Sequence, residues 1–440
     1  MPVQGAPAYD DKKLGRGKIL AKGGPDPEKE DRVMLVRQRV SHIYYKKKFF
    51  DYPVSMRPQT FINMGVAQAV KVGVSYLSAC LHKLPENSLE NFYINRFGRD
   101  FYSLFFEGYT EKLWGCHPRD ISADWGAQRV KGLSIAAVVK EMFEKMFLNK
   151  KEHIEEFIYP KYGPGQLWET AAAEIEAMGG KILKNCKVTG VQTENEKVTA
   201  LETKGANGAQ QIIEGDIFIS SMPLKDLVTS MGEVVPKDIR AIAEGLPYRD
   251  FVTVGLLVDH LNLKNLTKIR TLNNIVPDCW IYVQDTGVKL GRIQIFNNWS
   301  PYLVEDVDSK IWIGLEYFCN EGDSFWNLSD DKCIRLAVED LIRMGIISRK
   351  EDVLDSHREK LKKAYPAYFG TYGKIDQLIS YLNGFENLYC VGRNGQHRYN
   401  NMDHSMLTAF ETVKNILMGE KSRENIWNVN TEKEYHEEKA

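Results

Sequence analysis

The chain has 440 residues, of which 43% are hydrophobic and 11% aromatic, and its 58 Lys and Arg residues nearly balance its 59 Asp and Glu residues. That length exceeds one ordinary hydrophobic core, so we expect two intertwined domains. A net charge of −1 excludes a field that would gather nucleic acid or an anionic membrane over the whole surface.

The first third of the chain changes character twice. Residues 1–31 are rich in Gly, Lys, Asp and Pro without apolar periodicity, which predicts a loop or disordered tail. Residues 32–37 and 42–45 then predict a short pair of strands. From 58 to about 150 the pattern is helical, so we expect 32–158 to form a mainly helical cap subdomain. Within it, Asn87 followed by Glu90 resembles a capping box.

Residues 61–81 form the most apolar helical stretch, but polar residues interrupt it too often for a membrane span. Its apolar residues fall on one helical face: Val66, Val70, Val74, Leu77 and Leu81. We expect this face to pack on a core. A helix lying on a membrane surface is the alternative, which leaves peripheral membrane contact open.

The pattern after residue 159 alternates between helix and strand. Gly163-Pro164-Gly165 leads into a helix at 166–178, which ends at Gly179-Gly180. Strands are expected at 181–183, 186–192 and 197–203, followed by a buried strand at 216–221. This succession suits one half of an α/β nucleotide-binding domain, so we assign 159–240 to such a domain.

Longer strands with alternating hydrophobicity follow at 251–258, 279–283, 292–297 and 311–319, and a helix is expected at 328–344. Alternation predicts an antiparallel sheet with one buried face, so we expect 241–385 to form a substrate domain. Residues 386–420 return to the nucleotide-binding domain. The charged residues 421–440 predict a frayed tail.

Seven cysteines are dispersed without a C-x-x-C pair: Cys80, Cys116, Cys186, Cys279, Cys319, Cys333 and Cys390. Such a set indicates reduced thiols in a cytoplasm rather than a disulfide framework or a structural zinc site. His42, His117 and His153 share no metal-ligand spacing, so no metal site is expected.

The segment 387–405 combines a buried strand, a glycine turn, a polar loop and the start of a helix. Gly392 lets the backbone approach a flat or charged ligand closely. Asn401, Asp403 and Ser405 are each suitable N-cap residues. The N–H groups and partial positive charge of a helix start can stabilise the negative charge of a reduced flavin near N1 and the C2 carbonyl. On these residues alone, an ordinary turn is the alternative.

Four segments resemble one group of proteins. V-G-R-N-G-x-H-R-Y-N-N-x-D-H-S at 391–405 resembles the C-terminal FAD motif of the protoporphyrinogen-oxidase-like and amine-oxidase-like flavoproteins. F-F-E-G-Y-T-E-K-L-W-G at 105–115, continuing through 121–129, resembles their cap-domain signature. Y-G-P-G-Q-L-W at 162–168 and Y-P-x-Y at 365–368 are also similar to the group. The C-terminal pattern is similar to that of UDP-galactopyranose mutase as well, in which the flavin acts as a nucleophile on a sugar.

The resemblance implies an FAD-dependent oxidoreductase that oxidises a small organic molecule by hydride transfer to flavin, with a mutase-like flavoenzyme as the alternative. It implies an α/β fold, in which an FAD/NAD(P)-binding Rossmann-like domain joins a substrate domain of antiparallel sheet and helices. It implies FAD contacts from Val188, Gly392, Arg393, Asn401, Met402, Asp403 and Ser405, and a substrate pocket lined by Trp114, His397 and Tyr399. No catalytic acid or base is assigned, because the flavin does the chemistry.

One element of the group is absent from the sequence. No G-x-G-x-x-G, the turn that binds the pyrophosphate of FAD in a first βαβ unit, occurs in the chain. We therefore expect a Rossmann-like domain that lacks this unit and exposes a strand edge. Two readings stay open: the unit is supplied in trans, or the chain is an inactive truncated or split flavoprotein fragment.

Overall fold

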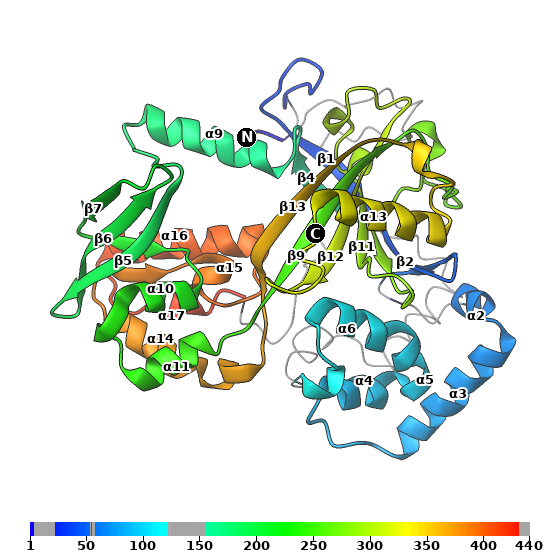
Figure 1. Ribbon diagram of the computed structural model, residues 1–440, viewed down its shortest axis with the longest axis horizontal. Coiled ribbons are helices and arrows are strands. Elements are labelled where there is room, and N and C mark those ends of the chain that lie inside the picture. Colours follow the sequence, from blue (N-terminus) through cyan, green and yellow to red (C-terminus); the bar gives the residue numbers. More distant parts are fainter. Residues whose placement is uncertain (4–22, 53, 55–57, 122, 124–154, 431–440) are drawn as a thin grey trace.

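The computed structural model describes residues 1–3, 23–52, 54, 58–121, 123 and 155–430. Figure 1 shows a central twisted sheet, a group of cap helices beside it, and a lobe of strands and helices on the opposite side. The cap comes from the first third of the chain, whereas the lobe combines the middle of the chain with its C-terminal part.

The central sheet has the strand order β13-β9-β12-β11-β10-β2-β3. Its strands are β2 (Ser41–Tyr45), β3 (Lys48–Asp51), β9 (Tyr248–Val258), β10 (Trp280–Val283), β11 (Arg292–Ile295), β12 (Ile311–Cys319) and β13 (Val353–Pro366). All neighbours are antiparallel except β10 and β2. The predicted antiparallel substrate sheet is therefore present, and two strands from the region expected to be cap complete it.

One face of this sheet is packed against α13 (Asp330–Met344), and the short helix α12 (Phe296–Trp299) follows β11 directly. Alternate residues of the central strands point into this core, and Val254, Leu256, Ile313 and Leu315 are fully buried. The period-two alternation that predicted these strands thus arises from a one-sided core.

The cap consists of α2 (Pro58–Met64), α3 (Val66–Leu81), α4 (Leu89–Phe97), α5 (Arg99–Tyr102), a π-helical turn (Ser103–Glu107) and α6 (Gly108–Trp114). Its core is aromatic, with Phe97, Phe101 and Phe105 buried. The N-cap of α4 is Ser88, whose Oγ accepts the Asn91 N–H at 3.3 Å. The expected capping box from Asn87 to Glu90 was therefore wrong by one residue at its start.

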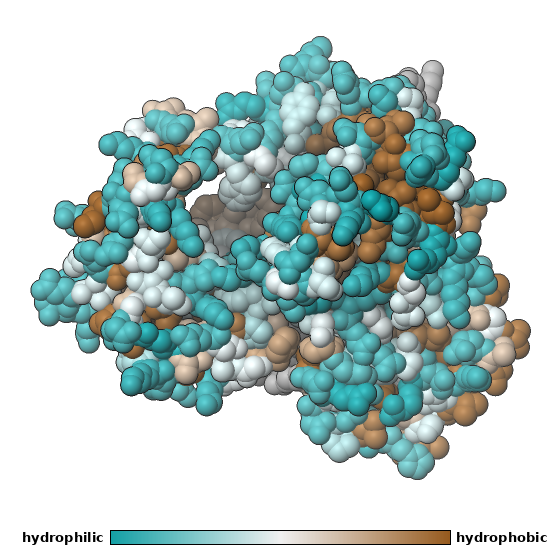
Figure 2. Space-filling view, viewed as in Figure 1, coloured by the Kyte–Doolittle hydropathy of each residue, from teal (hydrophilic) through white to brown (hydrophobic). Residues whose placement is uncertain are grey.

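The apolar face of α3 corrects another prediction. We expected this face to pack on a core, but the buried residues of α3 are Val72 and Ala79. The predicted stripe is exposed, at 82% for Val66 and 80% for Leu81, and Figure 2 shows apolar side chains on this side of the molecule. Among the described residues, no helix is long and apolar enough to cross a membrane.

The lobe is built around two parallel strands, β8 (Phe218–Ser220) and β14 (Leu388–Cys390), and a three-stranded sheet of β5 (Cys186–Glu194), β6 (Lys197–Gly205) and β7 (Gln210–Glu214). Its helices are α9 (Pro164–Ala177), α10 (Leu224–Met231), α11 (Lys237–Glu244), α14 (Ile375–Asn383), α15 (Gly392–Gly395), α16 (Met402–Met418) and α17 (Glu424–Trp427). Phe218 and Leu388 pack with α10, α11 and α14 in one core. Residues 181–183, expected as a strand, have no regular structure.

The first strands exist as predicted but pair differently. β1 (Met34–Arg39) pairs with β4 (Glu155–Pro160), whereas β2 pairs with β3 and β10. The expected pairing of 32–37 with 42–45 was therefore wrong. The tail also differs, because Ile426 and Trp427 of α17 are buried. Most of the expected N-terminal loop, and residues 431–440, lie outside the described residues.

Candidate flavin site and its aromatic wall

The glycine turn after β14 has the conformation that the sequence predicted. Gly392 has φ +75°, a region that favours glycine, and its N–H donates to Oγ of Thr408 in α16 at 2.9 Å. A Cβ at Gly395 would lie 2.7 Å from the Ser220 carbonyl oxygen, so the turn packs tightly on β8. The turn thereby connects both parallel strands to α16.

The helix that follows begins at Asn401, one of three N-cap residues considered from the sequence. The Asn401 N–H donates to Nδ1 of His404 at 3.2 Å, and Ser405 Oγ donates to the Asn401 carbonyl at 3.0 Å. The first-turn N–H groups of Met402 and Asp403 have no acceptor within the helix. Since Asn401, Met402 and Asp403 are exposed, this helix start is open to a ligand.

Arg393 joins this segment to the central sheet. Its Nε donates to the Asn400 carbonyl at 2.8 Å and its Nη1 to the Ala364 carbonyl at 3.0 Å. The guanidinium lies 4.7 Å from the ring centre of Tyr399, which stacks on Tyr365 with centroids 5.6 Å apart. The loop after β14 is thus held against β13 by one cation and two aromatic rings.

A second arginine continues this contact into the sheet. Arg292 Nε donates to Glu316 Oε2 at 2.7 Å, and its Nη2 donates to the Tyr365 hydroxyl at 2.6 Å. Gln294 Nε2 donates to Glu316 Oε1 at 2.6 Å. The side chains of Arg292 and Glu316 are 18% and 5% exposed. Burial alone would lower the pKa of Arg292, but the Glu316 carboxylate raises that pKa well above its ordinary value.

Tyrosines from β10, from α6 and from the segment after β3 cover the same side of the sheet. The rings of Tyr52 and Tyr282 stack with centroids 4.0 Å apart, and Tyr109 of α6 meets Tyr282 edge-on at 5.6 Å. Burial raises the pKa of Tyr109 and of Tyr282. Both phenols therefore keep their protons. We call the group formed by Tyr109, Tyr282, Arg292, Glu316 and Tyr365 the aromatic wall.

Lys112 fastens α6 to this wall. Its Nζ donates to the carbonyls of Val283 at 3.2 Å and Leu290 at 3.1 Å, and also to that of Asp285. Burial lowers the pKa of Lys112 to about 8. One buried cation therefore holds the cap to the loop between β10 and β11.

The predicted site residues divide into two groups. Gly392, Arg393, Tyr399 and the residues 401–405 lie in one continuous segment next to the wall, whereas Val188 lies in β5, partly buried against the lobe core. Trp114 is 5% exposed in the aromatic core of the cap. The structure thus brings the C-terminal segment together and leaves Val188 and Trp114 in other cores.

His397 is fully buried rather than facing an open pocket. Its Nε2 lies 3.0 Å from the Ala367 carbonyl, and Tyr248 meets its ring edge-on at 4.6 Å. Burial lowers the pKa of His397 to about 4. The imidazole is therefore neutral and fixes the C-terminal loop to the segment after β13.

Sequence reasoning missed Arg292 and Glu316, which face each other on β11 and β12. Neither residue belongs to a motif, and 24 positions separate them in the chain. Both residues alternate with the core-facing residues of their strands, so the pattern alone makes them look like exposed polar positions and gives no signal of their pairing. Tyr109 and Tyr365 did lie within the segments that resemble flavoproteins.

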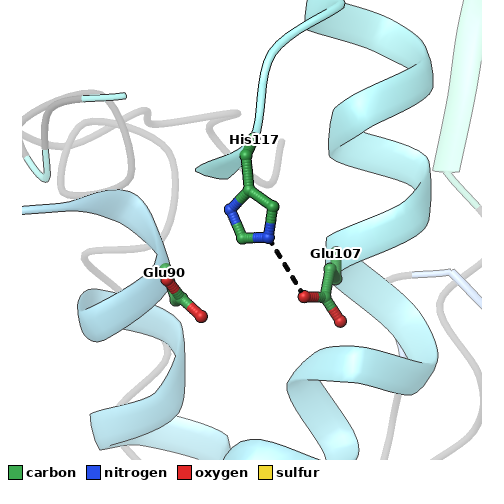
Figure 3. A group of neighbouring side chains, drawn as sticks. All are labelled: Glu90, Glu107 and His117. Carbon is green, nitrogen blue, oxygen red and sulfur yellow. Dashed lines mark ion pairs between the residues drawn. The ribbon is translucent and has the colours of Figure 1, made fainter. Parts of the chain in front are cut away.

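Figure 3 shows a separate cluster in the cap, formed by Glu90, Glu107 and His117. Their ligand-type atoms lie within 4.8 Å of one another, a proximity that the sequence spacing did not predict. His117 Nδ1 accepts from the Arg119 backbone N–H at 3.1 Å, and its Nε2 lies 3.3 Å from Glu107. Hydrogen bonds and an ion pair account for this arrangement, so we assign no metal there.

Solved structures share this fold. Reduced UDP-galactopyranose mutase aligns with a TM-score of 0.72 and 19% identity over 90% of this chain and 82% of that chain. A putative protoporphyrinogen oxidase from Exiguobacterium sp. 255-15 aligns with a TM-score of 0.56 and 13% identity over 82% and 76%. An oxidoreductase from Methanosarcina mazei aligns with a TM-score of 0.52 and 14% identity over 84% and 78%.

No protein-family model and no curated protein sequence matches the chain. The likeness in fold confirms the mixed α/β architecture that the resemblance to protoporphyrinogen oxidases and UDP-galactopyranose mutases implied.

Proposed function

We propose that this chain carries the isoalloxazine-facing part and the substrate wall of an FAD-dependent oxidoreductase. The observation that carries the proposal is the open start of α16 beside the aromatic wall. Backbone N–H groups at 402–403 suit the N1 and C2 carbonyl edge of the flavin, where negative charge develops on reduction. Bound FAD would supply the acceptor for a hydride from a small organic substrate.

The residues of this chain fit one end of FAD and not the whole molecule. Gly392, Arg393 and the start of α16 suit the isoalloxazine ring. Val188 on β5 is proposed for the adenine end, through its backbone. The sequence has no glycine-rich turn for the pyrophosphate. Isoalloxazine recognition is therefore the part of cofactor binding that this chain provides.

In this proposal the wall binds and orients the substrate. Tyr109 and Tyr282 present protonated phenols, which donate hydrogen bonds and offer ring faces. Arg292 is held by Glu316, so its position does not depend on the substrate. Lys112 keeps the cap helix over the wall, which excludes water from the reacting atoms.

Titration with FAD and with riboflavin, followed by flavin fluorescence, tests the proposal. Since the fit is to the isoalloxazine end, the two ligands should bind with affinities within about tenfold of each other. Anaerobic bleaching of bound flavin by an amine or another hydride donor would support oxidoreductase chemistry. Failure of both flavins to bind would contradict the proposal and favour an inactive fragment.

A mutase-like flavoenzyme is the second candidate, favoured by a specific feature. The Arg292 guanidinium donates to the Tyr365 hydroxyl, and the Arg393 guanidinium lies 5.6 Å from the ring centre of Tyr365. Arginine and tyrosine together suit a nucleotide-sugar diphosphate. Single-turnover assays with reduced flavin and UDP-sugars separate the two candidates. Isomerisation of the sugar without net redox change identifies the mutase. Net oxidation of a substrate without isomerisation of the sugar identifies the oxidoreductase.

A further inference from the structure

Helix α3 is apolar on two opposite sides and buries only one of them. Val72 and Ala79 pack into the cap and are 1% and 6% exposed. Five large apolar side chains of the same helix are 61–82% exposed: Val66, Val70, Val74, Leu77 and Leu81. At 3.6 residues per turn, these five fall within an arc of about 80°, opposite the two buried residues. With Ile62 of α2, which is 67% exposed, they form what we call the apolar ridge.

The apolar ridge lies where a large surface can reach it. Figure 1 shows α3 at the outer margin of the cap, away from the lobe, and Figure 2 shows apolar side chains gathered there. A Cβ built at Gly73, beside Val74, meets nothing within 4 Å. Helices that are apolar all round are normally covered all round, and contiguous exposed apolar patches mark contacts with proteins or membranes.

The sequence around the apolar ridge is basic. Residues 46–83 contain six Lys and Arg residues and one acidic residue, Asp51, which gives a net charge of +5 in a chain of net charge −1. No acidic residue occurs at 58–83. Lys71 is exposed on α3 beside the ridge, and Lys83 is exposed just after the end of the helix. The near-zero net charge of the whole chain therefore conceals a local basic surface.

The three lysines of the turn between β2 and β3 belong to the same surface. Lys48 Nζ donates to the carbonyl of Asn63 in α2 at 2.9 Å, and Asn63 Nδ2 donates to the Phe49 carbonyl at 2.8 Å. These two hydrogen bonds hold the turn against the helix that carries Ile62. Lys46 and Lys47 in this turn are exposed, so basic side chains also lie at the α2 end of the ridge.

We infer that the apolar ridge and the lysines around it are a docking surface for an anionic phospholipid bilayer, with α3 lying in the plane of the membrane surface. The apolar side chains enter the boundary between head groups and acyl chains, while the ammonium groups contact the anionic head groups. The inference is independent of the proposed flavin site, because no residue of the ridge belongs to that site.

Charge favours a bilayer over a second copy of the chain. A two-fold dimer through the apolar ridge would bring the same basic segment of both copies together, and like charges across an interface oppose association. An anionic lipid surface attracts those charges instead, and each lysine near the surface adds to the attraction. The apolar ridge and the basic segment are therefore both used only when the partner is an anionic membrane.

Cosedimentation of the full chain with lipid vesicles tests the inference. Vesicles of phosphatidylcholine with about 30% phosphatidylserine should bind at least about tenfold more tightly than pure phosphatidylcholine vesicles at physiological salt. Salt at about 1 M, where the Debye length is about 3 Å, should remove most of this difference. Equal binding to both kinds of vesicle, or binding to neither, overturns the inference.

A double variant with a matched control assigns the binding to the apolar ridge. Val70→Gln with Leu77→Gln should weaken binding to the anionic vesicles about tenfold or more, because two side chains no longer enter the bilayer. Ile212→Gln with Leu266→Gln removes two side chains that are 64% and 84% exposed elsewhere, and should bind as the unmodified chain does. Equal loss in both double variants contradicts docking through the ridge.

A second pair of variants separates the local lysines from net charge. Lys46→Gln with Lys71→Gln should weaken binding to anionic vesicles about tenfold and leave binding to neutral vesicles unchanged. Lys181→Gln with Lys184→Gln removes the same charge from exposed positions in the lobe and should have little effect. All the replaced side chains are exposed, so the variants should fold as the unmodified chain does. Equal weakening in both pairs would overturn the local charge contribution and with it the inference.

Sedimentation velocity without lipid tests the second copy as the occupant. If the apolar ridge meets a bilayer, Val70→Gln with Leu77→Gln leaves the sedimentation coefficient of the chain unchanged, and hydrogen exchange at residues 66–81 slows several-fold only when anionic vesicles are added. A dimer that dissociates in this double variant, with 66–81 already protected in the absence of lipid, would identify a second copy and overturn the inference.

Discussion

Strands β9 and β8 differ in how many neighbouring strands they pair with and in how far their side chains are buried. β9 lies between β12 and β13, and Val252, Val254, Leu256 and Val258 are fully buried on its core face. Within the described residues β8 pairs with β14 alone, and Ile217 and Ile219 are about half exposed. β9 is thus enclosed by its sheet and core, whereas β8 is open at one edge and on the face of its isoleucines.

This difference indicates which region contributes more to the stability of the fold. The central sheet, α13 and the aromatic cap bury large cores within the described residues. In the lobe, β14 is buried and Phe218 of β8 packs in a core, but Ile219 on the other face of β8 is half exposed. We therefore expect the central sheet with its aromatic wall to be more stable than the edge of the lobe at β8.

The largest expected effect is in the complete sheet. Glu316→Leu leaves the buried Arg292 guanidinium without its carboxylate, which should cost about 3–5 kcal/mol of unfolding free energy. Urea unfolding measures this loss. Glu321→Gln, which breaks an ion pair between exposed side chains, should cost less than about 1 kcal/mol. Similar losses of unfolding free energy in both variants would contradict the expectation that the buried ion pair contributes more than the exposed one.

Matched isoleucine truncations compare the two sheets directly. Ile313→Ala in β12 removes a fully buried side chain and should cost about 2–5 kcal/mol. Ile219→Ala in β8 should cost less than about 1 kcal/mol in the chain alone, because the side chain is half exposed. Equal costs would show that the Ile219 side chain is already covered.

His397, in the loop between β14 and α16, should make the unfolding free energy depend on pH. His397 has a pKa of about 4 in the folded chain against the usual 6.5, so the unfolded chain binds more protons between these values. Stability is therefore retained above pH 6.5 and falls as the pH drops toward 4, by about 3 kcal/mol.

His397→Asn removes this titration, and asparagine tolerates the left-handed backbone at this position. Unfolding free energies from pH 4 to 7 should therefore lose most of their slope in the variant. A slope that is unchanged by the substitution would assign the pH dependence to other groups.

Local patterns predicted much of the fold. Alternation predicted β9 and β12, and the N-cap residues placed the start of α16 within a few positions. The long strand β13 was missed, because it lies at the edge of the sheet, half of its residues are exposed and charged residues interrupt its apolar ones. The pairing of β1 with β4 was missed because it joins residues more than a hundred positions apart.

Only part of the candidate site lies in segments that the sequence singled out. The C-terminal segment and two wall tyrosines lie in motifs, and these could be read from the sequence. The Arg292–Glu316 pair depends on the register of β11 against β12, which no local pattern specifies. The apolar stripe of α3 shows a further limit of sequence patterns. Helical periodicity identified the apolar face of this helix, but it could not show whether another element covers that face.

The measurement that tests the central claim most directly is flavin binding by Met402→Pro. Met402 is the first residue of α16, where proline removes one N–H without disturbing the helix, and Asn401 already has extended backbone. Lys237→Pro at the same position of α11 is the matched control. If the start of α16 receives the isoalloxazine ring, Met402→Pro weakens riboflavin and FAD binding several-fold and lowers the reduction potential of the bound flavin, while Lys237→Pro changes neither. Unaltered affinity and potential in Met402→Pro would contradict the account.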